Sequence, residues 1–166
     1  MTPEQVKARA VECVTLAKSL VGTKGDVEFS AEHFGDCLDN MDFVIDVLKA
    51  VVEAGATTIN LPNTVERYRP MLYIKQVEQV VNALPKDVTI AVHCHNDLGM
   101  ATANTLAAIK NGADKVEVTM NGIGERAGNA ALEEVVMAMF TRGDVYGGYT
   151  NINTKEIMNT SRLVSS

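Results

Sequence analysis

Two histidines flanking a cysteine, in His93-Cys94-His95, are the residues of this sequence best suited to hold a metal ion. In a β-strand, side chains two positions apart point to the same face, so both imidazoles would lie side by side. Imidazole with the oxygen groups of Glu28, Glu117 and Asn121 favours zinc, manganese, iron or a similar divalent ion over calcium. A polar wall that holds two histidines without a metal is the alternative. The nearby Asp97 is expected to cap the helix that follows.

The glycine-rich segment Gly122–Asn129 carries the second group of candidate residues. Its spacing matches a dinucleotide-binding fingerprint only weakly, because no strand with an acidic end follows and Glu125 would face the anionic pyrophosphate. We interpret the segment instead as a tight, charged loop that brings Glu125, Arg126 and Asn129 over the mouth of a pocket. The alternative is a helix-entry turn in which Glu125 and Arg126 form a surface ion pair.

The segment Leu61–Pro70 follows a predicted strand and should therefore lie near the same pocket. Thr64 could bind a substrate carboxylate there, whereas Arg67 and Arg69 are better interpreted as solvated charges. Glu28 is expected to point inward from an earlier strand. A carboxylate in such a place is a candidate acid, base or substrate contact.

Four short β-branched runs, which start roughly 30 residues apart, must position these side chains. They cover residues 27–30, 57–61, 88–93 and 115–120. The apolar residues between them recur at the helical period, for example from Phe43 to Val51. Strands that alternate with helices predict consecutive βα units and a parallel sheet. A further helix precedes the first strand and begins with a capping box, in which Thr2 and Gln5 flank a proline at the first helical position.

Each predicted strand alternates between apolar and polar side chains, and the polar face includes Glu28, Asn60, His93, His95 and Glu117. A parallel sheet covered by helices on both faces would be apolar almost throughout. The alternation favours the wall of a (β/α)₈ TIM barrel, whose active site lies at the carboxyl ends of the strands.

Eight βα units need about 250 residues. We therefore predict an α/β chain that forms a partial TIM barrel, with an N-terminal helix followed by the four βα units of the second half. Residues 1–143 form this half-barrel and residues 144–166 the start of a linker. Two unpaired sheet edges would favour pairing with another half.

Composition excludes several classes of protein. The 166 residues are 46% hydrophobic and 22% charged, as in a folded globular domain. The net charge of −6 argues against a basic nucleic-acid-binding surface. No apolar run approaches the roughly 20 residues that span a membrane. Three cysteines at irregular spacing indicate a reduced, cytoplasmic protein.

Four motifs, taken in order along nearly the whole chain, resemble the 2-isopropylmalate synthase branch of the acyl-CoA-condensing barrel enzymes. They are Val27-Glu-Phe-Ser-Ala-Glu, Leu61-Pro-Asn-Thr-Val, His93-Cys-His-Asn-Asp-Leu-Gly and Gly122-Ile-Gly-Glu-Arg-Ala-Gly-Asn-Ala-Ala-Leu-Glu-Glu. Related lyases that cleave hydroxymethylglutaryl-CoA have a cysteine-bearing loop where this chain has Glu125-Arg-Ala. The resemblance therefore favours a synthase over a lyase.

This resemblance implies an acyltransferase that condenses acetyl-CoA with 2-oxoisovalerate to give 2-isopropylmalate and CoA, the first step of leucine biosynthesis. It implies that His93 and His95 ligate a divalent metal and that Asn129 lies at or near its coordination shell. Manganese is expected, with magnesium or zinc as alternatives. The metal would act as a Lewis acid on the oxo acid. The resemblance also implies a homodimer for the full-length enzyme.

The remaining site residues are carried over from the same motifs. Glu28 corresponds to a strand-end glutamate with a catalytic or substrate contact, and Thr64 to a threonine that binds the carboxylate of the oxo acid. Glu125 and Arg126 of the same motifs are further expected substrate contacts, and Asn60, on the polar face of its strand, is expected to be another.

The sequence also departs from the family. Many members have Pro-Asp-Thr-Val-Gly where this chain has Pro62-Asn-Thr-Val-Glu66. Nothing here supplies the Asp-Arg-Glu motif of the family's first barrel strand, whose aspartate is a metal ligand. We therefore expect the 166 residues alone to be inactive. Homocitrate or citramalate synthase is the enzymatic alternative. The non-enzymatic alternative is a half-barrel module that binds a metal or ligand only with a partner half.

Overall fold

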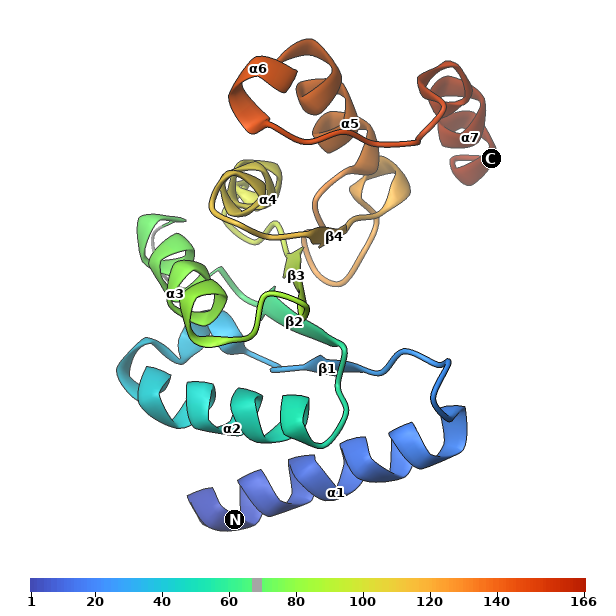
Figure 1. Cartoon of the computed structure of the whole chain (residues 1–166). Coiled ribbons are helices and arrows are strands. Elements are labelled where there is room, and N and C mark those ends of the chain that lie inside the picture. Colours follow the sequence, from blue (N-terminus) through green and yellow to red (C-terminus); the bar gives the residue numbers. More distant parts are fainter. Residues whose placement is uncertain (67–69) are drawn as a thin grey trace.

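A computed structural model describes residues 1–66 and 70–166 and shows a parallel sheet of four strands (Figure 1). Arg67 and Arg69, interpreted above as solvated charges, lie outside the described residues. The strands are β1 (Glu28–Ser30), β2 (Thr58–Asn63), β3 (Thr89–Cys94) and β4 (Lys115–Glu117). Each strand pairs with its predecessor in the chain, in the order β1-β2-β3-β4. In a doubly wound sheet the spatial order of the strands reverses at one point. The uninterrupted order found here therefore confirms the predicted barrel wall.

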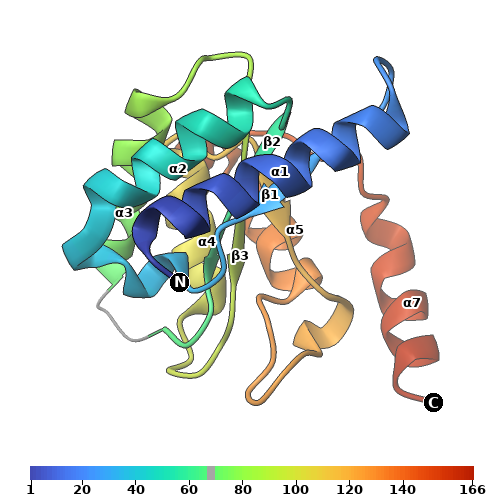
Figure 2. The same cartoon turned by 90° about the horizontal axis from the view of Figure 1, so that it is seen from below.

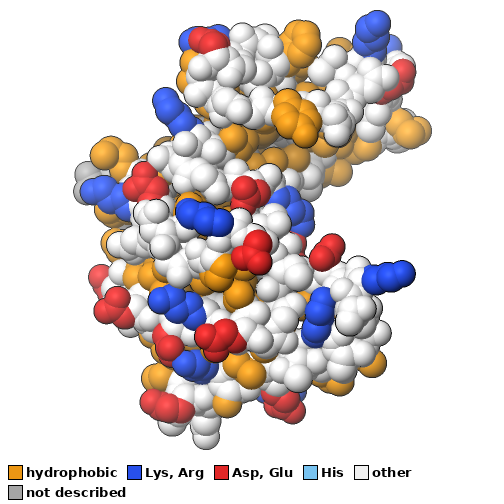
Figure 3. Space-filling view, in the orientation of Figure 1, with side chains coloured by type: hydrophobic (Ala, Val, Ile, Leu, Met, Phe, Trp, Pro, Cys, Tyr) orange, Lys and Arg blue, Asp and Glu red, His pale blue; other side chains and the backbone are white. Residues whose placement is uncertain are grey.

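Helices cover the outer side of this wall. In the described chain the helices are α1 (Pro3–Val21), α2 (Met41–Glu53), α3 (Pro70–Ala83), α4 (Ala101–Lys110), α5 (Leu132–Thr141), α6 (Gly143–Tyr146) and α7 (Ile157–Val164), of which α7 stands apart from this wall (Figure 2). Helices α2 to α5 follow one another around the outside of the curved sheet, and α1 lies beyond α2 (Figures 1 and 2). The opposite side of the sheet is open and the molecular surface is hollowed there (Figure 3). The structure is therefore half of a barrel, with an exposed inner face.

The predicted capping box starts α1. The backbone N–H of Gln5 donates to Thr2 Oγ1 at 3.3 Å, and the Gln5 side chain accepts from the Thr2 N–H at 2.9 Å. These reciprocal bonds satisfy two amides that lack helical partners. The helix is held to α2 by an ion pair of 2.8 Å between Lys7 and Asp46.

The hydrophobic core lies between the sheet and the helices, where the alternation of the strands predicts it. Helix-facing strand residues are buried, among them Ile59, Leu61, Ile90, Val92 and Cys94. They pack in one cluster with residues of α2 and α3, which include Val47, Leu48, Val51, Tyr73, Val77 and Val80. The Tyr73 hydroxyl also donates to the Leu61 carbonyl at 2.8 Å, which satisfies both polar groups in this apolar layer.

Strand β4 is shorter than predicted. The sequence pattern extends it to Met120, but the ladder with β3 ends at Glu117 and a 3₁₀ turn (η3) occupies Met120–Gly122. The reason is a competing partner: the Ala130 N–H donates to the Cys94 carbonyl at 3.0 Å, and the Thr119 N–H donates to the Ala130 carbonyl at 3.1 Å. The chain after the glycine-rich loop thus inserts between the ends of β3 and β4.

Residues 144–166, which the sequence assigns to the start of a linker, contain most of α6 and all of α7. Helix α7 stands at one side of the molecule (Figure 2). Its Ser161 hydroxyl donates to Asn121 Oδ1 at 2.6 Å, beside the glycine-rich loop. In the part of the chain that the structure describes, no helix has the length and apolar character needed to cross a membrane.

Candidate metal and substrate site

A polar cavity of about 400 Å³ opens on the inner face of the sheet, at the carboxyl ends of the strands. Nine residues line it: Ser30, Glu32, Asn60, Pro62, His93, His95, Glu117, Glu125 and Asn129. Six of these were named as candidates from the sequence: Asn60, His93, His95, Glu117, Glu125 and Asn129. A larger groove of about 670 Å³ beside β4 is mainly apolar and shares one lining residue, Glu117, with the polar cavity. The chemistry therefore points to the smaller cavity.

The two histidines meet in this cavity as the strand period predicts. Their ring centroids are 4.9 Å apart, with the rings tilted by 58°. Strand β3 ends at Cys94, and the His95 N–H continues the ladder by donating to the Asn63 carbonyl at 3.3 Å. Burial lowers the pKa of His95, and the charges of His93 and Arg126 lower that pKa further. The His95 ring is thus held in the neutral form that can ligate a metal.

The donor set fits part of a metal site. Asn129 Oδ1 and Asn60 Oδ1 are shielded from solvent and accept no hydrogen bond from any group that the structure describes. Both asparagines line the cavity of the two imidazoles, and an amide oxygen without a donor in such a cavity suits a divalent cation. Across the described residues, no cluster of three or more His, Cys, Asp and Glu side chains could hold a metal. His93, His95 and Asn129 therefore form an incomplete ligand set that requires further ligands.

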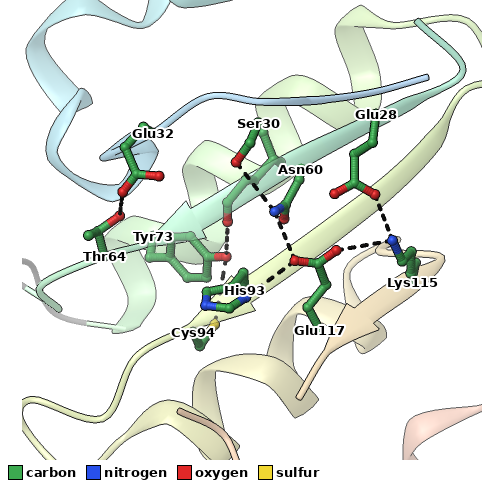
Figure 4. Close-up of polar contacts among 11 residues, drawn as sticks. Glu28, Ser30, Glu32, Asn60, Thr64, Tyr73, His93, Cys94, Lys115 and Glu117 are labelled. Atoms are coloured by element: carbon green, nitrogen blue, oxygen red, sulfur yellow. Dashed lines mark hydrogen bonds and ion pairs between the residues drawn. The ribbon is translucent and has the colours of Figure 1, made fainter. Parts of the chain in front are cut away.

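A network of carboxylates and Lys115 lies beside His93 (Figure 4). Glu117 Oε2 lies 3.3 Å from His93 Nδ1 and accepts from Asn60 Nδ2 at 3.1 Å. Lys115 donates to the other oxygen of Glu117 at 3.0 Å and to Glu28 at 2.6 Å. Burial raises the pKa of Glu117, but the hydrogen bonds and charges of its neighbours, Lys115 first among them, outweigh this effect and leave that pKa below its usual value. The ionised Glu117 can orient the His93 ring.

Glu28 does point to the inner face, but the structure does not bring it to the histidine pair. It pairs with Lys115 and is absent from the lining of the cavity. In the register of the sheet, Glu28 lies opposite Thr58, two residues before the layer of Ser30 and Asn60. That offset amounts to roughly 7 Å along the strand. The geometry gives Glu28 a structural contact.

The carboxylate that does reach the cavity from this segment is Glu32, which our sequence analysis did not single out. It lies two residues beyond β1 and accepts a hydrogen bond from Thr64 Oγ1 at 2.9 Å (Figure 4). Thr64 Oγ1 also accepts from the His33 N–H at 3.3 Å, so it lies behind Glu32 and not on the cavity wall. The signal was present in the sequence, because Glu28, Ser30 and Glu32 share the spacing of one strand face.

Arg126 joins the ends of two strands. Its guanidinium donates to Asp97 at 2.7 and 3.0 Å, lies 3.1 Å from His95 Nδ1 and also donates to the Thr64 carbonyl. The expected surface pair with Glu125 exists as well, at 3.4 Å. Arg126 therefore links the segments that follow β2 and β3 across the site. Neither interpretation of the loop predicted this role.

The prediction that Asp97 caps the following helix is wrong. Its carboxylate is engaged by Arg126, whose hydrogen bond lowers the pKa of Asp97. Asn96 takes the expected place, because its Oδ1 accepts from the Ala101 N–H at 3.2 Å at the start of α4. Adjacent carboxylate and amide side chains both cap helices, so local sequence alone did not separate them.

The glycines of the loop serve close packing against Asn129. A Cβ on Gly124 would lie 2.7 Å from both polar atoms of the Asn129 amide. Glycine therefore lets the loop fold over that side chain and hold it at the cavity. This geometry supports the interpretation of Gly122–Asn129 as a tight, charged loop over the pocket mouth, since Glu125 and Asn129 both line the cavity.

Both the sequence and the fold of this chain match known proteins. The family profile that matches is HMGL-like, over residues 1–164, and the chain belongs to this family. It is 48% identical over 165 residues to 2-isopropylmalate synthase 2 of Leptospira interrogans, covering 99% of this chain and 38% of that protein. It is 53% identical over 167 residues to 2-isopropylmalate synthase of Campylobacter fetus, covering 100% of this chain and 32% of that protein.

Solved structures show the same fold. Hydroxymethylglutaryl-CoA lyase from Pseudomonas aeruginosa superposes with a TM-score of 0.74 at 18% identity, over 97% of this chain and 54% of that one. The partial TIM barrel predicted from the sequence is thus confirmed. The chain spans well under half the length of the two synthases named above.

Proposed function

We propose that this chain is part of the catalytic barrel of an acyltransferase that condenses acetyl-CoA with 2-oxoisovalerate. In that reaction the acetyl methyl group loses a proton, its carbon attacks the ketone, and water cleaves the thioester to give 2-isopropylmalate and CoA. The support is identity of 48% and 53% to proteins named 2-isopropylmalate synthase. The observation that carries the proposal is that His93 and His95 line one cavity with Asn129, whose amide oxygen has no hydrogen-bond partner among the described residues.

Those three residues would hold a divalent cation, with manganese as the first candidate and magnesium or zinc next. When bound, the cation would supply Lewis-acid stabilisation of the negative charge that develops on the ketone oxygen. The chain contributes the orientation of the ligands: Glu117 contacts the His93 ring and Arg126 contacts the His95 ring.

The oxo acid would lie between these ligands and the ends of β1 and β2. Asn60 and Glu125 line the cavity on either side of the histidines and are the proposed substrate contacts. Glu32 is the proposed group for proton transfer, because its carboxylate reaches the cavity and is held by Thr64. Thr64 and Arg126 act on the substrate through the residues that they hold in place.

A chimera tests this function directly. The segment of the Leptospira interrogans synthase that aligns with this chain, 48% identical, would be replaced by residues 1–166. We expect acetyl-CoA-dependent release of CoA with 2-oxoisovalerate, and its loss when His93→Ala and His95→Ala are introduced together. Residues 1–166 assayed alone should show no turnover, because they supply an incomplete ligand set.

The same assay separates the homocitrate and citramalate alternatives. A host named 2-isopropylmalate synthase should keep its preference for 2-oxoisovalerate if this segment performs the same reaction. A shift of preference toward 2-oxoglutarate would favour homocitrate synthase, and a shift toward pyruvate would favour citramalate synthase. An inactive but folded chimera would count against the proposed function.

A further inference from the structure

Glu66 is a carboxylate buried in the loop that follows β2, at 0% exposure. The backbone of Glu66 has φ of 53°, in the left-handed region. This conformation is energetically unfavourable for a residue other than glycine, because its Cβ comes too close to the backbone. Such a conformation persists where the surrounding contacts determine it. The side chain of Glu66 is therefore held in a specific place.

Both carboxylate oxygens of Glu66 bind the segment that follows β3. Oε2 accepts from the Leu98 N–H, and Oε1 accepts from Asn104 Nδ2 at 3.1 Å. Asn104 belongs to α4 and is itself fully buried. Glu66 thus ties the loop after β2 to the loop that carries Asp97.

The contacts of Glu66 lie beyond the end of the hydrogen-bonded ladder between β2 and β3. Among the described residues, the last main-chain bond between the two segments runs from the His95 N–H to the Asn63 carbonyl, at 3.3 Å. Beyond that bond, side chains join the loops from two sides: Glu66 in the interior, and Arg126 at the surface, where it contacts the Thr64 carbonyl and His95 Nδ1.

We propose that Glu66 is a positioning residue that fixes the loop of Asp97, and through Asp97 the Arg126 guanidinium, against His95 and Thr64. This inference rests on the proposed function, since it assigns His95 and Thr64 to the site. A carboxylate is required because both of its oxygens accept from N–H groups. Glutamine has the same shape but would turn an amide N–H toward one of the two donors.

The test measures the contacts of Arg126 with Asp97 and His95 directly and does not require catalytic activity. In the whole ¹⁵N-labelled chain, NMR reports hydrogen exchange of the Arg126 Nε–H and the ¹⁵N shifts of the His95 ring. Glu66→Gln should speed that exchange about tenfold or more and move the His95 shifts, because the Asp97 acceptor is no longer held. Asp97→Asn, which breaks the Arg126 pair directly, should change both signals in the same sense.

Two further variants separate positioning from general destabilisation. Val51→Ala opens the core on α2, so it should lower stability and leave the Arg126 and His95 signals unchanged. Asn104→Ala removes one partner of Glu66 and keeps the carboxylate, and it should give an intermediate change. It carries the test if Glu66→Gln does not fold.

Unchanged Arg126 and His95 signals in the folded Glu66→Gln variant, or in Asn104→Ala, would overturn the proposal. So would equal changes in Val51→Ala at matched stability. Because these signals do not depend on catalysis, such a result would leave the condensation reaction to be judged by the chimera alone.

Discussion

The two faces of the sheet differ in what they do, although the same strands build both. The helix-facing side buries Leu61, Val92 and Cys94 in an apolar layer. The inner side gathers His93, Glu117 and their polar partners around an open cavity. The period of two along each strand separates the residues that stabilise the fold from those that carry the chemistry. Substitutions on one face should therefore spare the property that belongs to the other.

The largest expected effect is on the apolar face. Leu61→Ala should lower the free energy of unfolding by about 2–5 kcal/mol, because a fully buried side chain leaves a cavity between β2 and the helices. Urea denaturation monitored by circular dichroism measures this change. Loss of less than about 1 kcal/mol would show that this face is loosely packed, which would weaken the comparison.

Cysteine reactivity sharpens the comparison without a substitution. Burial raises the pKa of the Cys94 thiol to about 11, whereas Cys13 is exposed on α1. Because the thiolate is the reactive form, native Cys94 should be alkylated at pH 8 more than about 100-fold more slowly than Cys13. Mass spectrometry of a time course gives both rates. In urea the alkylation rates of the two cysteines should converge. Fast alkylation of Cys94 in the native chain would contradict its burial on the helix-facing side of the sheet.

The smallest expected effect is the pH dependence at Glu66. Burial raises the pKa of this carboxyl, although hydrogen bonds from the backbone of Leu98 and Met100 oppose the shift. The unfolded chain releases this proton near pH 4.3 and the folded chain at a higher pH. The contribution of Glu66 to stability therefore falls as pH rises through that window.

Denaturation of the wild type and of Glu66→Gln at a series of pH values measures this contribution. As the pH rises from about 4 to 7, the free energy of unfolding of the variant should increase relative to that of the wild type, because glutamine does not ionise. A relative free energy of unfolding that stays constant with pH, or that changes in favour of the wild type, would contradict the direction of the pKa shift.

Local patterns were sufficient to predict the four βα units and the division of faces, although not α7 or the end of β4. The capping box of Thr2 and Gln5, the order of the βα units and the shared face of His93 and His95 each depend on residues close in sequence. The position of the cavity along the strands was not predictable in this way. Glu28 and Glu32 have the spacing of one strand face, and only the lining of the cavity shows that Glu32, and not Glu28, reaches it.

Contacts between distant residues account for the other differences. Arg126 and Asp97 are 29 positions apart, and their ion pair removed Asp97 from its expected role as a helix cap. Strand β4 ended early because Ala130 bonds to Cys94, which lies well before it in the chain. Neither contact leaves a periodic signal, since each depends on how the glycine-rich loop folds back over the strand ends.

Calorimetric titration of Mn²⁺ into the 166-residue chain tests most directly whether the inner face holds a divalent cation. The matched control is the double variant His93→Ala and His95→Ala, which should keep the stability of the wild type within about 1 kcal/mol. We predict stoichiometric binding that weakens at least about tenfold in the variant. Equal binding by both proteins would contradict the assignment of His93 and His95 as a metal site, whereas no binding by the wild type would show that the incomplete ligand set needs a ligand from outside these residues.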